Sequence, residues 1–425
     1  MNGRRLGAAS LGLLAAGMVV NLSMVVYYRV LSGRLGSAYA QLWALMGVLS
    51  VLGNVTLGLN TYLVKAFSAD LELLGPGAVK GRLLRQLKPG LIGLGTLAAI
   101  LALLSPWLES YLKLPGLGLV LIMDALFAAG VLLLGLRSAQ QGLHHFGWLG
   151  LSQAGEGLAV VGAVCGPVRS VAGGLTARLL GQAFGGLCTL GGLVGLGPAR
   201  SPAPLPGDER PLRQALFEGG SDTLALTLLA LLCYLDVFVL KHYYSDERAG
   251  LYSRAALVAK SFLFLPAALN MVLLAAAARE MAGGRDPRRL LKVFLLGALA
   301  LDAVGLAVVW VGTSFCMGLL AGSDPRFRTD AVLALTRWFS LAVIPLSLLQ
   351  MVVVYLLAVR RRGVALGLGL LALAYLLLLR LVWASELAVV ASLGACSLAG
   401  LAGALWAALA RPPTRLGPVL ARAGA

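Results

Sequence analysis

Apolar stretches of about 20 residues recur along the chain from near its first residue to residue 410. A helix needs about that length to cross the hydrocarbon core of a bilayer. Lipid cannot satisfy backbone N–H and C=O groups, so such segments must bond within themselves as helices. Only 12% of the 425 residues are charged, against roughly 25% in an average soluble domain. The pattern therefore predicts an all-α, polytopic membrane protein.

The apolar runs predict about twelve transmembrane helices in two halves. Their approximate ranges are 6–28, 41–64, 90–112, 117–136, 149–167, 171–198, 215–240, 250–278, 290–320, 330–358, 364–382 and 385–410. The longest break, GPARSPAPLPGDERPLRQ from Gly197, is rich in proline and charge and falls near the middle of the chain. We therefore expect an N-terminal lobe of six spans at 1–198, a cytoplasmic linker at 199–214, and a C-terminal lobe of six spans at 215–425 with a short cytoplasmic tail.

The two halves share a pattern that indicates an internal repeat. YYRVLSGRLGSAYAQLWAL and FVLKHYYSDERAGLYSRAAL each place a basic residue at a helix end, followed by a polar hinge and a small-x-Tyr motif. The corresponding pairs, at offsets of 212 to 214 positions, are Arg29 with Lys241, Tyr39 with Tyr252, and Lys65 with Arg279. Because each half has an even number of spans, the two repeats would run parallel, related by an axis along the membrane normal.

The formal net charge of +17 does not indicate a nucleic-acid partner. The basic residues are scattered in short connections, and no contiguous basic domain tracks a phosphate backbone. Most of them fall on the side of the N-terminus, which the positive-inside rule places in the cytoplasm, so both termini are expected there. The apolar run after Arg4 and Arg5 is too long for an ordinary signal peptide and is expected to stay as the first span.

The sequence motifs that mark common enzyme chemistry are absent. There is no G-x-x-x-x-G-K-[ST] loop, no nucleophile elbow and no H-E-x-x-H helix. The five cysteines form no C-x-x-C pair, and the three histidines form no metal-binding pattern. With every connection short, we expect a transporter without cofactor or metal rather than an enzyme.

Ionised residues inside the apolar runs are the main candidates for function, because a charge in a span is costly and faces a partner or a water-filled cavity. The expected substrate-binding cations are Arg29, Lys65, Arg178, Lys241, Arg254 and Lys260. Snorkelling of the charged group to the membrane interface explains the positions of Lys65 and Arg254 as well as substrate binding does. For Arg29 and Lys241 a structural role at a helix end is at least as good an explanation. Two further ionised residues within the predicted spans are Asp302, expected to be structural, and Arg337.

Three carboxylates, Asp236, Asp124 and Glu156, are candidates for ion coupling or for pairing with a cation. Asp236 comes after LALTLLALLCYL and has no interface within easy reach, so it either forms an ion pair with Lys260 or Arg178 or lines a cavity. Asp124 and Glu156 could pair with Arg178. Polar side chains of the second span either face a cavity or bond helices together; they are Asn54, Thr56, Asn60 and Thr61.

Three segments resemble those of a known family. YRVLSGRLGSAYAQLWALMGVL resembles the start of bacterial polysaccharide flippases, and LRSAQQGLHHFGWLGLSQ resembles their connection between spans four and five. YLDVFVLKHYYSDERAGLYSRAALVAKSFLFLP is similar to their segment around an aspartate in span seven, with Tyr234 where the family has asparagine. The resemblance covers about 280 residues from the N-terminus. It points to the oligosaccharidyl-lipid flippases of the multidrug/oligosaccharidyl-lipid/polysaccharide exporter superfamily.

The resemblance implies two six-helix lobes around a central cavity in a bacterial inner (cytoplasmic) membrane. It also implies a flippase that moves a prenyl-pyrophosphate-linked oligosaccharide from the inner to the outer leaflet by alternating access. Coupling to Na⁺ or H⁺ stays open. The first alternative is a cation-coupled multidrug exporter of the same superfamily, against which the many candidate cations argue. The second is a membrane-embedded glycosyltransferase or polymer ligase, against which the short outer connections argue.

Overall fold

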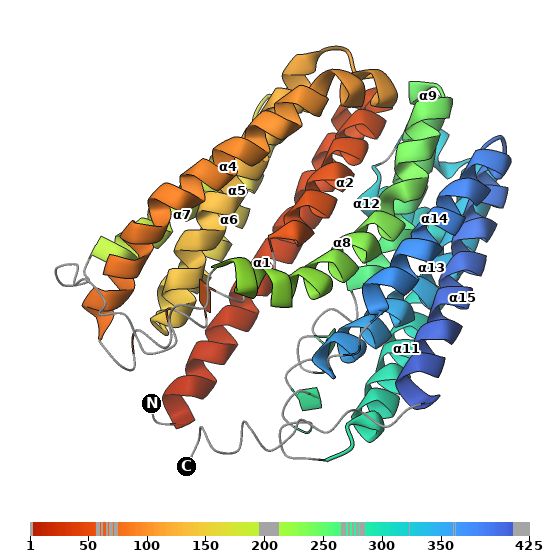
Figure 1. Ribbon diagram of the computed structural model, residues 1–425. Helices are drawn as coiled ribbons and strands as arrows, with labels where there is room; N and C mark the ends of the chain where they lie inside the picture. Colours follow the sequence, from red (N-terminus) through yellow and green to blue (C-terminus); the bar gives the residue numbers. More distant parts are fainter. Residues whose placement is uncertain are drawn as a thin grey trace. The chain divides into compact units, whose positions relative to one another are not determined.

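A computed structural model of the chain describes most of its length as helix (Figure 1). The described residues are 3–56, 75–194, 212–264, 285–322, 324–359 and 363–410, with isolated positions between 60 and 71, between 269 and 280, and at 361. Within them the regular structure is helical, as predicted, and no strand occurs. The chain divides into two compact units, residues 1–223 and 224–425.

The first unit is a bundle in which α6 packs between α1 and α7, while α5 contacts α2, α4 and α7. In Figure 1 the helices α4, α5, α6 and α7 run side by side. Its elements are α1 (Gly3–Arg34), the short 3-10 helix η1 (Gly36–Ala38), α2 (Tyr39–Val55), α4 (Pro76–Leu112), α5 (Leu117–Gly142), α6 (Phe146–Cys165) and α7 (Val171–Val194). The close approach of α6 and α7 requires glycine: a Cβ on Gly181 would lie 2.9 Å from the carbonyl oxygen of Glu156.

The second unit is organised around α13, which contacts α9, α11 and α15. The helix α8 (Leu212–Tyr243) begins in the first unit and continues into the second. The elements that follow it are α9 (Asp246–Lys260), η2 (Ser261–Phe264), α11 (Arg288–Val311), α12 (Thr313–Leu320), η3 (Pro325–Arg328), α13 (Asp330–Ala358), α14 (Val364–Val382) and α15 (Glu386–Ala410). Of the predicted linker 199–214, residues 199–211 lie outside the described part of the chain, and 212–214 already belong to α8.

Four helix contacts of the first unit recur in the second in the same chain order, whereas the extensive α1–α6 contact has no counterpart of similar extent between α8 and α14 among the described residues. The pairs α4–α5, α5–α7, α6–α7 and α2–α5 correspond to α11–α13, α13–α15, α14–α15 and α9–α13. Tyr39, the first residue of α2, and Tyr252, in the second turn of α9, are both buried, as expected of repeat equivalents. The proposed equivalents Lys65 and Arg279 lie outside the described residues. This shared contact order is expected of an internal repeat, and the parallel arrangement of the two halves stays a prediction.

An arginine in each unit bonds the connection between the last two long helices of that unit. Arg34, the last residue of α1, donates to the carbonyl of Val164 at 2.8 Å and to further carbonyls in the turn that joins α6 to α7. Arg248, at the start of α9, donates to the carbonyl of Ala384 at 3.0 Å and pairs with Glu386, where α14 meets α15. The residue numbers of the two arginines differ by 214, which matches the offset of the predicted repeat.

Among the described residues, ten helices are long and apolar enough to cross a membrane, so the predicted count of twelve is not confirmed. The helix α7 is not one of these ten. Its glycines, together with Arg178 and Gln182, lower its mean hydropathy. The predicted span 250–278 is α-helical as far as Lys260 and continues as the 3-10 helix η2; of residues 265–278, those that are described, namely 269, 270, 273, 276 and 277, are α-helical. The predicted span 290–320 breaks at Gly312 into α11 and α12, since glycine disfavours a continuous helix.

Large apolar side chains face outward on both units. Leu103, Val311 and Leu381 expose 81%, 91% and 80% of their surface. A soluble protein would bury most such side chains, but in a bilayer the surrounding lipid is as apolar as leucine. The outer surface is therefore consistent with contact with lipid, whereas the buried polar groups are concentrated between helices.

Candidate functional site

A pocket of about 210 Å³ lies between α2, α5 and α7, entirely within the first unit. We call it the Arg178 pocket. Its described lining consists of Met46, Leu49, Ser50, Gly53, Thr56, Leu126, Phe127, Gly130, Val131, Arg178 and Gln182. Arg178 is the charged member of this described lining, and no carboxylate belongs to it. The pocket is therefore mostly apolar, with a few polar groups and a positive charge on its α7 wall.

Arg178 is held from one side by α1. Its Nη1 donates to the sulfur of Met24, and its guanidinium carbon lies 5.9 Å from the centre of the Tyr27 ring. The Tyr27 hydroxyl in turn donates to the carbonyl of Gly174 on α7, at 3.1 Å. The Nε of Arg178 is buried and has no hydrogen-bond partner among the described residues. Arg178 is thus positioned by packing and keeps a free donor.

Gln182 lies one helical turn after Arg178 and lines the same pocket. Its Oε1 is also buried without a partner within the described part of the chain. Residues four apart share a helix face, so the i, i+4 spacing from Arg178 is the signal by which sequence reasoning could have found Gln182. The α7 wall of the pocket therefore contains one arginine donor and one amide acceptor that are buried and have no partner among the described residues.

The polar side chains of the second predicted span both line a cavity and bond segments together, the two roles expected of them. Thr56 lines the Arg178 pocket. Asn60 accepts a hydrogen bond from the Ser138 hydroxyl of α5 at 2.7 Å, which joins two segments of the unit. Asn54 donates to the carbonyl of Ser50 within α2 at 2.8 Å. Thr61 lies outside the described residues.

The carboxylates of the first unit have partners other than Arg178. Glu156 on α6 pairs with Arg137 at 2.8 Å, and Asp124 on α5 accepts a hydrogen bond from the Ser105 hydroxyl of α4 at 3.3 Å. The expected pairing of Glu156 and Asp124 with Arg178 is therefore not seen. The predicted span 117–136 ends just before Arg137, but α5 continues to Gly142, so the Arg137 side chain projects from this helix and reaches α6.

Asp236 and Lys260 form a buried ion pair in the second unit, one of the two pairings expected for Asp236. The Lys260 Nζ lies 2.7 and 2.9 Å from the two carboxylate oxygens and donates to the carbonyl of Cys233 at 2.6 Å. The Tyr252 hydroxyl donates to the same carboxylate at 2.8 Å. Asp236 and Lys260 are 0% and 3% exposed. Each charge is thus neutralised and hydrogen-bonded by its neighbours, as a buried charge requires.

Lys241 also has an acidic partner. It lies near the end of α8, almost fully buried, and its Nζ is 2.5 Å from the carboxylate of Asp246, the first residue of α9. Arg29, its predicted equivalent in the first unit, is half-buried and takes part in an interaction of its own. Lys65 lies outside the described residues.

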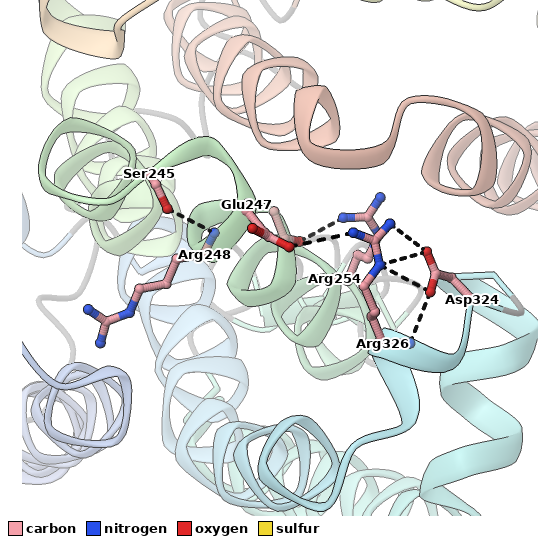
Figure 2. A network of polar contacts seen from close by, with 7 residues as sticks. Ser245, Glu247, Arg248, Arg254, Asp324 and Arg326 are labelled. Carbon is pink, nitrogen blue, oxygen red and sulfur yellow. Dashed lines mark hydrogen bonds and ion pairs between the residues drawn. The ribbon is translucent and has the colours of Figure 1, made fainter.

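Arg254 of α9 lies beside Arg326 and Asp324, at the 3-10 helix η3 (Figure 2). Its guanidinium carbon is 4.1 Å from the centre of the Phe327 ring, and the residue is 2% exposed. Arg326 bonds Asp324 at 2.9 Å and reaches Glu247 of α9 at 3.5 Å, so ion pairs link this turn to α9. The hydrogen bonds from Arg326 hold the pKa of the partly exposed Asp324 carboxyl below its usual value. Arg254 is therefore packed within the second unit, under an aromatic ring.

The two further ionised residues also lie in the second unit. Asp302 is fully buried on α11, and neither of its carboxylate oxygens has a hydrogen-bond partner among the described residues. Arg337 on α13 donates to the Thr313 hydroxyl at 2.8 Å, directly after the break at Gly312. Sequence reasoning had no signal for this contact, because the break itself was not predicted.

Comparison with known proteins identifies the family. The family described as "Polysaccharide biosynthesis protein" matches residues 7–274, which is more than half of the chain. No curated protein matches the sequence. The family match includes all three segments on which the predicted resemblance depends.

Solved structures show the fold. An inward-facing multidrug resistance MATE transporter of the MOP superfamily superimposes with a TM-score of 0.74 at 11% identity, covering 93% of this chain and 97% of its own. The lipid II flippase MurJ, in an inward closed conformation, has a TM-score of 0.67 at 10% identity, covering 94% and 87%. A MOP superfamily transporter from Pyrococcus furiosus, whose binding pocket is described as having reverse polarity, has a TM-score of 0.65 at 13% identity, covering 94% and 93%.

These findings agree on the class of protein. The family match extends through nearly the whole first unit, and the three structures match nearly the full length of the chain. At such low identity the structures establish the fold alone. The chain is therefore a multi-pass membrane protein that belongs to the family described as "Polysaccharide biosynthesis protein", and it has the fold seen in the three solved transporters.

Proposed function

We propose that this protein is a flippase for a lipid-linked oligosaccharide, which it moves on its prenyl-pyrophosphate carrier from the inner to the outer leaflet. The family match supports a role in polysaccharide biosynthesis. The observation that carries the proposal is Arg178, a cation within the membrane-embedded helices that lines a pocket without a carboxylate among its described residues. A cation in such a place is costly unless an anion meets it, and a pyrophosphate supplies that anion.

The membrane potential would favour this direction of transport. Moving an anion outward across an inside-negative membrane gains about 2.3 kcal/mol per charge per 100 mV. A pyrophosphate diester carries two negative charges, so the gain is about 4.6 kcal/mol at 100 mV. This driving force would suffice without ATP, for which the sequence has no P-loop. Additional coupling to Na⁺ or H⁺ is compatible with the same mechanism.

The proposed mechanism is alternating access, with the two compact units as the moving bodies. Arg178 is the leading residue for substrate binding. Arg29 and Lys65 are further proposed contacts. Lys241, Arg254 and Lys260 are engaged with Asp246, Phe327 and Asp236 in this structure, so they would bind substrate only after these contacts open.

We assign the other proposed features in the same way. Asp236 acts as the charge partner of Lys260, while Asp124 and Glu156 remain candidates for coupling.

We propose that the protein lies in a bacterial inner membrane with both termini in the cytoplasm, which agrees with the distribution of arginine and lysine. Reporter fusions at residues 1 and 425 test the orientation: both are expected to be active as cytoplasmic reporters, and an active periplasmic reporter at either end contradicts it.

A cation-coupled multidrug exporter is the second candidate, because the inward-facing multidrug transporter covers nearly the full length of this fold. A pocket for cationic drugs needs carboxylates and aromatic faces. Among the described residues of the Arg178 pocket there is one aromatic side chain, Phe127, and no carboxylate. The charge of this pocket therefore favours an anionic substrate.

Translocation by the purified full chain tests the proposal. Proteoliposomes carry a prenyl-pyrophosphate-linked oligosaccharide in the inner leaflet, and a soluble glycosidase detects its arrival outside. We expect wild type to exceed protein-free vesicles, with Arg178→Gln at least tenfold slower. Arg380→Gln is the matched control, because Arg380 lies exposed in the last turn of α14. Translocation no faster than in protein-free vesicles, together with export of cationic drugs, would favour the second candidate.

A further inference from the structure

Asp302 is a carboxylic acid buried in the second unit, and no described residue pairs with it. It is 0% exposed on α11, and neither carboxyl oxygen has a hydrogen-bond partner among the described residues. With a rise of about 1.5 Å per residue, it lies about 21 Å from the first residue of α11 and about 14 Å from the last. An ionised carboxylate at that depth would lose its hydration without compensation, so the group takes up a proton and becomes neutral.

Among the described residues, no charged side chain reaches Asp302. Its polar neighbour across the helix contact is the Ser347 hydroxyl of α13, whose oxygen is also buried without a described partner. Arg337 precedes Ser347 by ten positions, about 15 Å along α13, and it bonds Thr313 of α12. Lys292, on α11 itself, is also ten positions from Asp302. None of the remaining described titratable residues on α11, on α12 and α13, or between 269 and 280 interacts with this carboxyl; they are Arg288, Arg289, Cys316, Asp330, Tyr355 and Glu280.

The first unit has a similar pair at the equivalent helix contact. Asp124 of α5 accepts a hydrogen bond from Ser105 of α4 at 3.3 Å, and its other oxygen is buried without a described partner. The α4–α5 contact corresponds to the α11–α13 contact of the second unit. The acid lies on the second helix of the pair in one unit and on the first helix in the other. A buried acid beside a hydroxyl thus recurs at the same contact, which argues against a chance placement of Asp302.

The contact between α11 and α13 is weakest next to Asp302. Pro345 lies inside α13, two residues before Ser347, and because it has no N–H it leaves one carbonyl of the preceding turn without its helical bond. Helices kink at such positions. Towards the end of α11 and the start of α13, the rings of Trp310 and Trp338 pack with their centres 6.0 Å apart. The two helices are therefore held together at that end and can separate at the Pro345 turn.

We infer that Asp302 is a proton-binding site that controls the packing of α11 against α13. With its proton the acid is neutral and the dry contact of this structure is stable. Without the proton its charge needs water, so the helices separate at the Pro345 turn. The ligand is a single proton, which passes between the carboxyl and water when the contact opens. The inference goes beyond the proposed function, because no substrate takes part in it.

The sign of the pH effect follows from the two states. A solvated aspartate is ionised above about pH 4, so each opening of the contact at neutral pH releases one proton. Raising the pH therefore favours the open form, by about tenfold per pH unit for one proton. The increase ends at the pH at which the packed form also loses its proton. An uncharged side chain at position 302 removes the effect.

Infrared difference spectroscopy of the purified full chain at neutral pH tests the protonation. We expect wild type to show the stretch of one protonated carboxyl, shifted in D₂O, that Asp302→Asn lacks; any band from Asp124 cancels in the difference. Asp330→Asn removes an exposed carboxylate at the start of α13 and should leave this band in place. Asp302→Leu should also fold and lack the band, because a neutral acid without a partner needs no counter-charge. The same band in folded Asp302→Asn and Asp302→Leu would overturn the inference.

Hydrogen exchange of α11 and α13, corrected for the intrinsic effect of pH, tests the control of packing. From about pH 5 upward, opening of the wild-type contact should rise about tenfold per pH unit, whereas opening in Asp302→Asn should stay constant. Pro345→Ala should open less at every pH and keep the wild-type slope. A wild type without pH dependence, or the same slope in folded Asp302→Asn, would overturn the inference, and wild-type opening in Pro345→Ala would overturn the hinge. Absence of translocation in proteoliposomes would contradict the proposed function alone.

Discussion

The ion pair between Asp236 and Lys260 makes a sharp prediction about stability, because both charges are almost fully buried in the second unit. Lys260→Met removes three short hydrogen bonds and leaves the Asp236 carboxylate without its cation, although the Tyr252 hydroxyl still donates to it. Breaking one side of a buried ion pair costs about 3–5 kcal/mol. Asp236→Asn should cost a similar amount, because the buried Lys260 ammonium would lose its carboxylate and keep only the carbonyl of Cys233 as a partner.

The double variant Asp236→Asn with Lys260→Met removes both charges together. Buried ion pairs can often be replaced by uncharged residues with little loss, so we expect the double variant to cost less than about 2 kcal/mol. The stability losses of the two single variants would then exceed that of the double variant by several kcal/mol in sum. Independent positions depart from additivity by only about 0.3–0.5 kcal/mol.

Thermal unfolding of the purified chain, followed by tryptophan fluorescence, measures these effects. For a unit of this size 1 kcal/mol corresponds to about 2–4 °C in Tm, so each single variant should lose about 6–20 °C and the double variant less than about 8 °C. Tyr234→Phe is a suitable control, because its ring stays near Lys260 while only the hydroxyl is lost. Additive losses, with the double variant least stable of all, would refute a coupled buried pair.

The remaining predictions concern packing, the arginine contact of the first unit, and pH. Gly181→Ala should lower Tm by several degrees, because its Cβ would lie 2.3 Å from a Val160 methyl, whereas Gly186→Ala has open space and should change little. Arg34→Gln should lower Tm and speed proteolysis at the α6–α7 turn, since several carbonyls lose their donor; an unchanged cleavage rate would argue against this role. The depressed pKa of Asp324 means that the turn η3 keeps its ion pair above the usual aspartate pKa and loses it only as pH falls below that value; NMR of a ¹³C-labelled carboxyl checks this.

Most of the helix limits could be predicted from the sequence, because hydropathy is a local property of each segment. The predicted spans 330–358 and 364–382 coincide with α13 and α14, and the short, glycine-rich prediction 149–167 corresponds to α6. The predictions failed where a local signal was weak, as at Gly312, where a single glycine inside a long apolar run ends one helix and begins another.

The positions of the intramembrane charges could also be read from the sequence, but their partners could not. Asp236 and Lys260 are 24 positions apart, and Arg34 bonds a turn about 130 positions away. Such pairings depend on how each helix is rotated about its axis and how closely it approaches its neighbours. Glycine contacts between distant segments set both quantities, as at Gly181.

The sequence by itself determined that this chain is a bundle of membrane helices with an excess of cations in and beside its apolar runs, because both facts depend only on the order of apolar and charged residues. The tertiary structure decided which cations are neutralised and which are not. Lys260 and Lys241 meet carboxylates and Arg254 lies under an aromatic ring, whereas Arg178 faces a pocket with a donor that no described residue bonds. That distinction depends on side-chain geometry across several helices.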